Sequence, residues 1–181
     1  MGEFRPPELE RIVVIGTSCA GKSTFARQLS KKLSLEYVEL DVLFWAPQWQ
    51  PKPLAEFHQL VTQIAARPNW IVEGNYGSAR DMLWPRATTI IWLNYSFSTV
   101  LWRALRRTVH RALTRQTLWH GNKESIRRSF FSRKSILVWI VKTFHRRQRE
   151  FSALRAQEKY AQLNWLEFTT PFEAASYLNS I

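Results

Sequence analysis

A glycine-rich segment between an apolar run and an amphipathic stretch constrains this chain more than any other feature. The apolar run, Arg11-Ile-Val-Val-Ile15, is typical of a buried strand, and Phe25 to Leu33 carries apolar residues at helical spacing. Between them, residues 16–24 read Gly-Thr-Ser-Cys-Ala-Gly-Lys-Ser-Thr, which fits the pattern G-x-x-x-x-G-K-[ST]. Strand, glycine-rich turn and helix in this order predict a phosphate-binding P-loop.

The residue types in this segment suit a bound phosphate. Gly16 and Gly21 allow a tight turn that brings backbone N–H groups up to phosphate oxygens, and the following helix directs its positive dipole end to the same place. Lys22 can reach the β- and γ-phosphates, and the Ser23 hydroxyl can ligate Mg²⁺. The predicted nucleotide-binding residues are Gly16, Thr17, Ser18, Cys19, Ala20, Gly21, Lys22, Ser23 and Thr24.

Length and composition limit the class of protein. The chain has 181 residues, of which 45% are hydrophobic and 22% charged, as is typical of a globular domain. Its longest apolar run, Ile136–Val141, is far shorter than the roughly 18 residues of a membrane helix. No signal-peptide apolar region follows Met1, and Cys19 is the only cysteine, so an internal disulfide is impossible. We therefore expect one cytoplasmic domain over residues 1–181.

The net charge of +12 admits two kinds of partner. Basic residues concentrate between Arg103 and Arg155, and a strongly basic domain is the first criterion for a nucleic-acid binder. An enzyme with polyanionic substrates also needs arginines around its cleft. Because no helix-turn-helix, zinc-finger or RNA-recognition pattern accompanies the charge, small anionic substrates are favoured and nucleic acid remains open.

Strand-like and helix-like segments alternate along the rest of the chain. Further strands are predicted at 36–40, 70–72, 89–93 and 165–168, and helices at about 57–64, 98–115, 125–160 and 171–178, with Ser98 as an N-cap. Trp70, Trp92 and Trp139 stand at apolar positions and are predicted core residues. The alternation predicts an α/β fold whose parallel sheet is covered on both faces.

Polar residues follow the predicted strands, where ligands bind in such folds. Asp41 follows the second strand and can orient or deprotonate a substrate hydroxyl, hold Mg²⁺ through water, or cap a turn. Glu73 follows the third and can do similar work or pair with an arginine. Gly74 admits close approach of a substrate or simply marks a turn. We expect these residues, with Asn75, to meet the P-loop in one crevice.

Several sequence blocks resemble the adenylate-kinase-related P-loop proteins known as DNA topology modulation proteins. The blocks are residues 16–24, 40–45 with Trp49, 70–76, 80–81 and 90–93, and the resemblance extends over nearly the whole chain. The chain is more distantly similar to shikimate and nucleoside-monophosphate kinases. The resemblance implies a three-layer P-loop NTPase fold, a five-stranded parallel sheet of order 2-3-1-4-5, and a helical lid at about 111–128.

The same resemblance implies roles for residues outside the P-loop. Arg111 and Arg115 would bring positive charge on the lid to the transferring phosphoryl group, and Arg80 would hold an acceptor phosphate. The block from Asn75 to Arg80 departs from the nucleotide-kinase pattern, which leaves the acceptor open. Asn94 follows the fourth strand, where many P-loop enzymes have a metal-holding Asp, so either Asp41 or Ser23 with phosphate would hold the metal.

The leading hypothesis is a small kinase that moves the γ-phosphate of ATP or GTP, with Mg²⁺, to a small hydroxyl or phosphate acceptor. The alternative is an ATP-binding regulatory protein associated with nucleic acid; the oligomeric state is open. The predicted catalytic residues are Lys22, Asp41, Arg111 and Arg115, the substrate residues are Asp41, Glu73, Gly74, Asn75 and Arg80, and the metal ligand is Ser23.

Overall fold

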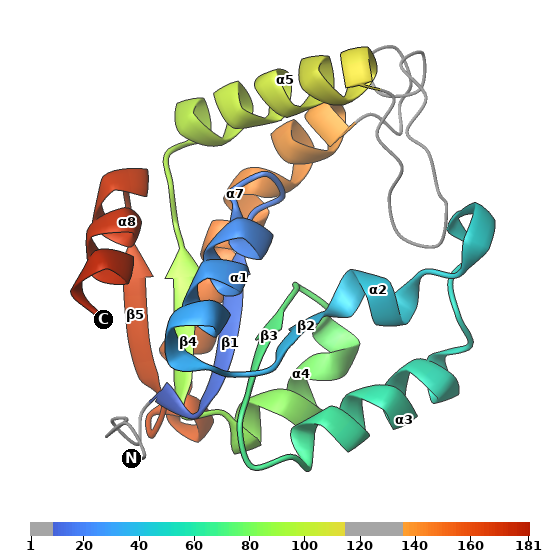
Figure 1. Ribbon diagram of the computed structural model, residues 1–181, viewed down its shortest axis with the longest axis vertical. Coiled ribbons are helices and arrows are strands. Elements are labelled where there is room, and N and C mark those ends of the chain that lie inside the picture. The colour runs from blue at the N-terminus through green and yellow to red at the C-terminus, as the bar shows by residue number, and fades with distance from the viewer. Residues whose placement is uncertain (1–8, 115–135) are drawn as a thin grey trace.

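Five parallel strands form the centre of the part of the chain that the computed structural model describes, residues 9–114 and 136–181 (Figure 1). The side chains of residues 111–114 and 136 lie outside that description. The strands are, in spatial order, β2 (Tyr37–Glu39), β3 (Trp70–Glu73), β1 (Arg11–Gly16), β4 (Thr89–Leu93) and β5 (Asn164–Phe168), and every neighbouring pair is parallel. The predicted three-layer α/β P-loop fold with sheet order 2-3-1-4-5 is confirmed.

The central strand β1 shows why both faces of the sheet need helices. Its side chains alternate, so that Ile12 and Val14 enter one core and Val13 and Ile15 the other, and none is more than 1% exposed. The first core is covered by α1 (Lys22–Leu33), α5 (Phe97–Thr114) and α8 (Pro171–Ser180), and the second by α3 (Leu54–Ala65) and α4 (Gly77–Leu83).

Helix α7 (Ile136–Arg155) contributes to both cores. Ile140 and Phe144, near its beginning, pack with α1 and α5, whereas Phe151 and Leu154, near its end, pack with β4 and the second core. In Figure 1 the helix descends from α5 and passes behind the sheet. It therefore joins the region above the P-loop to the opposite face of the sheet.

Two helix starts show how local sequence sets the element boundaries. Pro171 occupies the first turn of α8, as predicted, and Thr170 and Glu173 form a reciprocal capping box. The predicted cap of α5, Ser98, is wrong by two residues: the helix begins at Phe97, and the Thr99 N–H donates to Ser96 Oγ at 3.3 Å. Ser96, not Ser98, therefore precedes the helix and accepts from its first turn.

Other differences from the sequence prediction affect the site. Strand β2 stops at Glu39, and Asp41 lies in the first turn of a short helix, α2 (Leu40–Phe44), that the sequence did not predict. Helix α4 was also missed, because its seven residues are too few for a clear periodic pattern. Trp70 and Trp92 are buried as predicted, but Trp139 is 48% exposed on α7, so the prediction of a core residue there is wrong.

The basic second half is described only in part. The predicted helix at 125–160 corresponds to α7 from residue 136 onward, and residues 125–135 lie outside the described residues. The predicted lid at 111–128 lies outside them too, apart from the backbone of 111–114 at the end of α5. Within the described ranges, no helix combines the length and apolarity that crossing a membrane requires.

Candidate active site

The P-loop joins the end of β1 to the start of α1. Helix α1 begins at Lys22, and its Phe25 N–H donates to the Gly21 carbonyl at 3.0 Å, so the helix N-terminus faces the loop. The Lys22 ammonium folds back and donates to the Thr17 carbonyl at 3.3 Å. Strand, loop and helix therefore have the arrangement that presents N–H groups and a lysine to phosphate oxygens.

Gly21 is favoured at its position by its backbone conformation, and Arg103 lies close to it. Its φ of +96° is left-handed, and a Cβ there would lie 2.7 Å from the Arg103 Nη1 atom. Arg103 reaches over from α5, donates to the Ala20 carbonyl at 2.8 Å, and stacks on the Tyr95 ring at 5.2 Å. A guanidinium from α5 therefore lies directly against the loop, a contact that the sequence analysis did not predict.

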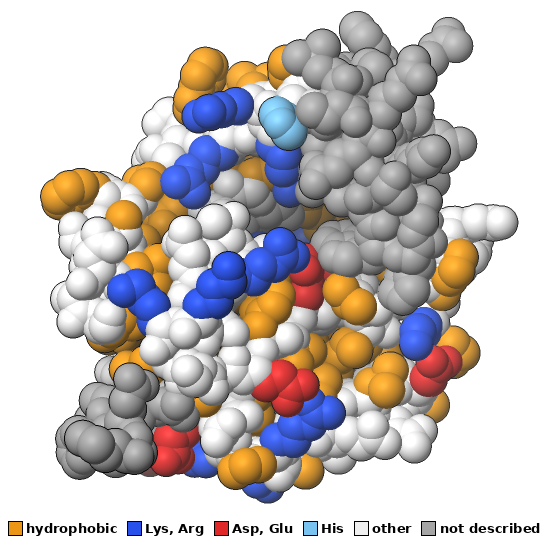
Figure 2. Space-filling model, viewed as in Figure 1, with side chains coloured by type: hydrophobic (Ala, Val, Ile, Leu, Met, Phe, Trp, Pro, Cys, Tyr) orange, Lys and Arg blue, Asp and Glu red, His pale blue; other side chains and the backbone are white. Residues whose placement is uncertain are grey.

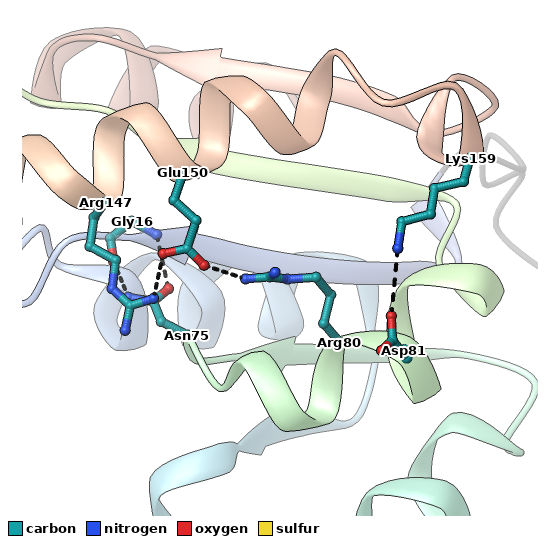
Figure 3. A network of polar contacts seen from close by, with 7 residues as sticks. All are labelled: Gly16, Asn75, Arg80, Asp81, Arg147, Glu150 and Lys159. Atoms are coloured by element: carbon teal, nitrogen blue, oxygen red, sulfur yellow. Dashed lines mark hydrogen bonds and ion pairs between the residues drawn. The ribbon is translucent and has the colours of Figure 1, made fainter.

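Asn75 ties the end of β3 to the beginning of the P-loop. Its Nδ2 donates to the Gly16 carbonyl at 2.5 Å, and the Gly16 N–H lies 3.4 Å from its Oδ1 (Figure 3). Both backbone groups of Gly16 are thus held by one side chain. The sequence predicted Asn75 as a substrate residue, whereas in the structure its amide contacts the P-loop backbone.

Ser23 contacts a buried carboxylate from the neighbouring strand. Its hydroxyl donates to Glu73 Oε1 at 2.9 Å and lies 3.5 Å from Glu39 Oε1. Glu73 is 3% exposed and Glu39 6%, and Arg27 donates to Glu39 Oε2 at 3.1 Å. Arg27 thus pairs with Glu39, and among the described residues no arginine forms an ion pair with Glu73. Glu39 itself was missed, although a glutamate at the end of an apolar strand beside Asp41 was the available signal.

The environment of Glu73 favours its protonated form. Burial raises its pKa to about 7, against the lowering effect of the Lys22 charge and with a further increase from Glu39. Its Oε2 atom is buried and accepts no hydrogen bond from the described residues. A buried carboxylate oxygen without a donor, beside a second carboxylate, is an environment that a cation would stabilise.

These groups fit a magnesium ion held together with nucleotide phosphates. Among residues 9–114 and 136–181 no cluster of three or more His, Cys, Asp or Glu side chains has a metal-binding arrangement. Mg²⁺ in phosphate-transferring sites takes only one or two carboxylates, with waters and phosphates completing its shell. Ser23 and Glu73 supply such a set. Asn94, which follows the fourth strand, is held by other side chains. It donates to Glu167 at 2.7 Å and accepts from Gln148 at 2.9 Å.

Asp41 lies beside a cluster of aromatic rings. Tyr76 donates to Asp41 Oδ1 at 2.5 Å, and burial together with the Asp41 charge raises the pKa of the Tyr76 phenol. Phe44 packs on Tyr76 with ring centroids 4.8 Å apart and on Trp45 at 4.9 Å, and Trp45 packs edge-on against Trp49 at 5.9 Å. Asp41 is therefore oriented by a phenol that belongs to this aromatic cluster.

One cavity of about 970 Å³ joins these features. Figure 2 shows the hollow below α5, bordered by Lys and Arg side chains. It is lined by P-loop and α1 residues, by the carboxylates Glu39, Asp41 and Glu73, by Trp45 and Trp49, by Tyr95, Arg103, Arg106 and Arg107, and by Pro171, Ala174, Ala175 and Leu178 of α8. The structure thus brings Asp41 and Glu73 together with Lys22 and Ser23, as the sequence predicted.

The remaining predicted residues lie apart from this cavity or outside the description. Gly74 has a φ of +145°, and a Cβ on it would meet Leu40 Cβ at 2.8 Å, so it allows β3 to pack against α2. Arg80 donates to Glu150 at 2.6 Å and is not among the residues that line the cavity. The Arg111 side chain and Arg115 lie outside the described residues, and the described arginines that line the cavity are Arg27 of α1 and three arginines of α5.

Comparison with known proteins identifies the fold. No family model matches the chain, and no curated protein matches it significantly, so the resemblance to DNA topology modulation proteins rests on the sequence blocks alone. Solved structures that are similar include a shikimate kinase from Aquifex aeolicus, with 16% identity, TM-score 0.52 and 94% coverage of both chains.

Two further solved structures are similar to the chain over nearly the same length. A shikimate kinase from Bacteroides thetaiotaomicron has 14% identity and TM-score 0.56, covering 94% of this chain and 95% of its own. A gluconokinase from Sinorhizobium meliloti has 18% identity and TM-score 0.52, covering 97% and 94%. The chain therefore has the three-layer P-loop fold of small-molecule kinases, over nearly its whole length.

Proposed function

We propose that the protein is a phosphotransferase that moves the γ-phosphoryl group of ATP or GTP to a small acceptor. The observation that carries the proposal is the lining of one cavity of about 970 Å³ by Lys22 and Ser23, by Asp41 and Glu73, and by arginines of α5. Phosphoryl transfer needs phosphate binding, positive charge and an acceptor-orienting group at close quarters. The small-molecule kinases with the same fold support this reading.

The nucleotide phosphates would lie on the P-loop. Its N–H groups and the N-terminus of α1 would bind the phosphate oxygens, and Lys22 would leave the Thr17 carbonyl to contact the β- and γ-phosphates. Arg103, Arg106 and Arg107 border the same cavity and would stabilise charge on the transferring group. Arg111 and Arg115 are proposed to add to that charge from the lid.

The base of the nucleotide would lie between α5 and α8. That part of the cavity is lined by Tyr95, Arg103, Pro171 and Ala174, which offer apolar surface and one guanidinium plane. An aromatic base prefers such a mixture of apolar contacts and a stacking cation. The proposal covers both ATP and GTP.

Ser23 and Glu73 would hold Mg²⁺ when the nucleotide is bound. The ion would supply charge neutralisation at the β- and γ-phosphate oxygens. The ion would bind the ionised form of Glu73, whose pKa is about 7 in the protein without ligands. Bound Mg²⁺ would therefore favour ionisation of Glu73, and ionised Glu73 would favour the binding of Mg²⁺.

Asp41 would position the acceptor hydroxyl and receive its proton. The acceptor oxygen forms a bond to the γ-phosphorus while the bond from that phosphorus to the β,γ-bridging oxygen breaks and the nucleoside diphosphate leaves. Tyr76 holds Asp41 through Oδ1, which leaves Oδ2 to accept the proton. Asn75 would act indirectly by holding Gly16.

Replacement of Lys22 by Ala tests the proposal. We expect acceptor-dependent release of nucleoside diphosphate to fall by about 100-fold or more, with the thermal unfolding midpoint little changed because Lys22 is not a core residue. Lys31→Ala, in the last turn of the same helix and outside the cavity lining, is the matched control. Unchanged turnover in Lys22→Ala would contradict the assignment. Nucleotide binding without transfer to any acceptor would favour the regulatory alternative.

A further inference from the structure

Resting on the proposed function, we propose that the acceptor is an uncharged ring that carries a hydroxyl group, and that Trp45 and Trp49 hold its face. A sugar, a cyclic polyol or a nucleoside shares this chemistry. Because no cation of the described residues is directed at the acceptor, a ring with a phosphate or carboxylate group would be the poorer acceptor. Three observations carry the inference: the distribution of charge along the cavity, the pairing of Arg80, and the conformation of Trp49.

The cations and the carboxylates that line the cavity come from different elements. The cationic lining residues Lys22, Arg27, Arg103, Arg106 and Arg107 all belong to α1 and α5. The carboxylates Glu39, Asp41 and Glu73 lie at the ends of β2 and β3 and in α2. Glu39 is paired with Arg27 and Glu73 lies at Ser23, so Asp41 is the carboxylate proposed to face the acceptor, and it would repel a like-charged group.

Arg27 and Lys22 are directed at groups other than an acceptor. Arg27 already donates to Glu39 at 3.1 Å, and Lys22 lies over the P-loop, where it donates to Thr17. The Glu73 carboxylate remains next to Ser23, where the phosphates and metal would be. Among the described residues that line the cavity, neither of these cations is thus directed at the place proposed for the acceptor beside Asp41.

Arg80 is the cation that a bound anion would need on this side, and it is engaged elsewhere. It donates to Glu150 at 2.6 Å, and Glu150 also accepts from Arg147 at 3.0 Å (Figure 3). The Arg80 guanidinium also lies 5.2 Å from the Trp84 ring centroid and is only 18% exposed. These contacts hold Arg80 against α7 and away from the cavity lining.

Trp49 has a backbone conformation that is costly for an aromatic residue. Pro47 to Gln50 form a tight turn in which Gln48 and Trp49 both have positive φ, 60° and 58°. Such a turn favours Asn-Gly, and a bulky residue with positive φ is a true outlier. Strain of this kind concentrates at binding sites, and here it accompanies an indole that lines the cavity.

The turn is anchored so that it presents both indoles together. Trp45 pairs with Pro51 in an antiparallel bridge, the Ala46 N–H donates to the Gln50 carbonyl at 2.8 Å, and the Lys52 N–H donates to Phe44 at 2.8 Å. Trp45 in turn packs edge-on on Phe44. Two preorganised indoles beside Asp41 offer a ring apolar faces and offer its hydroxyl a carboxylate.

The test compares matched neutral and anionic acceptors with the full chain, ATP and Mg²⁺. The panel pairs glucose with glucose 6-phosphate and glucuronate, myo-inositol with its monophosphate, and adenosine with AMP, and the sugar and nucleoside arms separate the two sources. Two readouts are taken: labelled phosphoryl transfer, and acceptor binding by saturation-transfer NMR with a non-hydrolysable ATP analogue. We expect kcat/KM for a neutral ring to exceed that of its anionic counterpart by about 100-fold.

Trp49→Ala identifies the subsite. It should raise the acceptor KM by about tenfold, because one stacking contact is lost, and leave kcat and the KM for ATP within about twofold. Trp49→Phe should restore most of the acceptor binding. Trp102→Ala on α5, which removes an indole that is 66% exposed and outside the cavity lining, is the matched control and should change nothing.

The two readouts separate this inference from the proposed function. Transfer to an anionic member as fast as to its neutral counterpart, or an unchanged acceptor KM in Trp49→Ala, overturns the inference while the kinase assignment stands. Neutral-ring binding that Trp49→Ala abolishes, without any transfer, supports the acceptor class and counts against a phosphotransferase. Failure of the whole panel to bind overturns the inference.

Discussion

The Ser23 hydroxyl of the P-loop donates a 2.9 Å hydrogen bond to Glu73, a carboxylate from the neighbouring strand that is 3% exposed. Residues 50 positions apart in the chain meet because β1 and β3 are adjacent and parallel, so that both end at the same edge of the sheet. The contact places an ionisable group, raised in pKa to about 7, where phosphates and Mg²⁺ are proposed to bind.

The first prediction concerns stability and pH. Because the pKa of Glu73 is higher in the folded protein than its usual value near 4.5, the folded state binds its proton more tightly between pH 4.5 and about 7. The free energy of unfolding of the protein without nucleotide and metal should therefore fall as the pH rises through this window. Glu73→Gln should remove that fall and stabilise the protein at pH 7.5 by on the order of 1–3 kcal/mol.

Thermal unfolding at pH 5 and pH 7.5 checks this. Glu158→Gln, at an exposed position in a short 3₁₀ turn, is the control and should follow the wild-type profile. Glu73→Gln should also lose the increase in unfolding midpoint that Mg²⁺ and nucleotide together give the wild-type protein. An identical pH profile in Glu73→Gln and wild type would show that Glu73 is not the titrating group.

The second prediction concerns Asn75. Its amide contacts both the carbonyl and the N–H of Gly16, so Asn75→Ala leaves two strand-end backbone groups without their partner. We expect a loss of about 1–2 kcal/mol in unfolding free energy and weaker nucleotide binding, since the start of the P-loop is no longer held. Chemical denaturation and calorimetric titration with ATP and Mg²⁺ measure the two effects.

Asn179→Ala, near the exposed end of α8, is the matched control for Asn75→Ala. If Asn75 acted on the substrate alone, as its sequence position first indicated, the variant would change the acceptor KM and leave stability and nucleotide affinity unchanged. That result would contradict the positioning role.

The sequence predicted the P-loop and a parallel α/β sheet because both depend on local patterns: a β-branched run, a glycine spacing and an alternation of strand and helix. The strand order was implied only by the resemblance to known P-loop proteins. It also predicted that Asp41 and Glu73 would approach the P-loop, because the carboxyl ends of parallel strands share one edge. It did not predict the contact of Arg103 with the loop at Gly21. That contact depends on how α5 crosses above the sheet, and the local sequence around Arg103 does not determine this crossing.

Arg80 is a second residue whose contacts the sequence did not predict. By resemblance, its position after β3 indicated a ligand of an acceptor phosphate. In the structure its guanidinium instead donates to Glu150, which lies 70 positions further along the chain on α7. Pairing between distant helices follows from packing, and neither local spacing nor residue type contains it. Trp139 was likewise predicted as core from its apolar neighbours, although the face of α7 that carries it is exposed.

The third prediction concerns this ion pair between α4 and α7. Burial alone would raise the pKa of Glu150, but its hydrogen bond from Arg80 and the charges of Arg147 and Arg80 outweigh it and lower the pKa below the usual value near 4.5. The stabilisation from the ionised carboxylate is therefore fully present above the unfolded-state pKa and is lost as the pH falls through the lower folded-state value.

Glu150→Gln should cost on the order of 1 kcal/mol at pH 7 and progressively less in acid. A double-mutant cycle with Arg80→Ala, monitored by urea denaturation at pH 7 and pH 3, measures the coupling, and the exposed pair Lys52 and Glu56 at 2.8 Å provides a reference cycle. A coupling for Arg80 and Glu150 no larger than that reference, or one that is the same at both pH values, would mean that the pair does not hold Arg80 against α7.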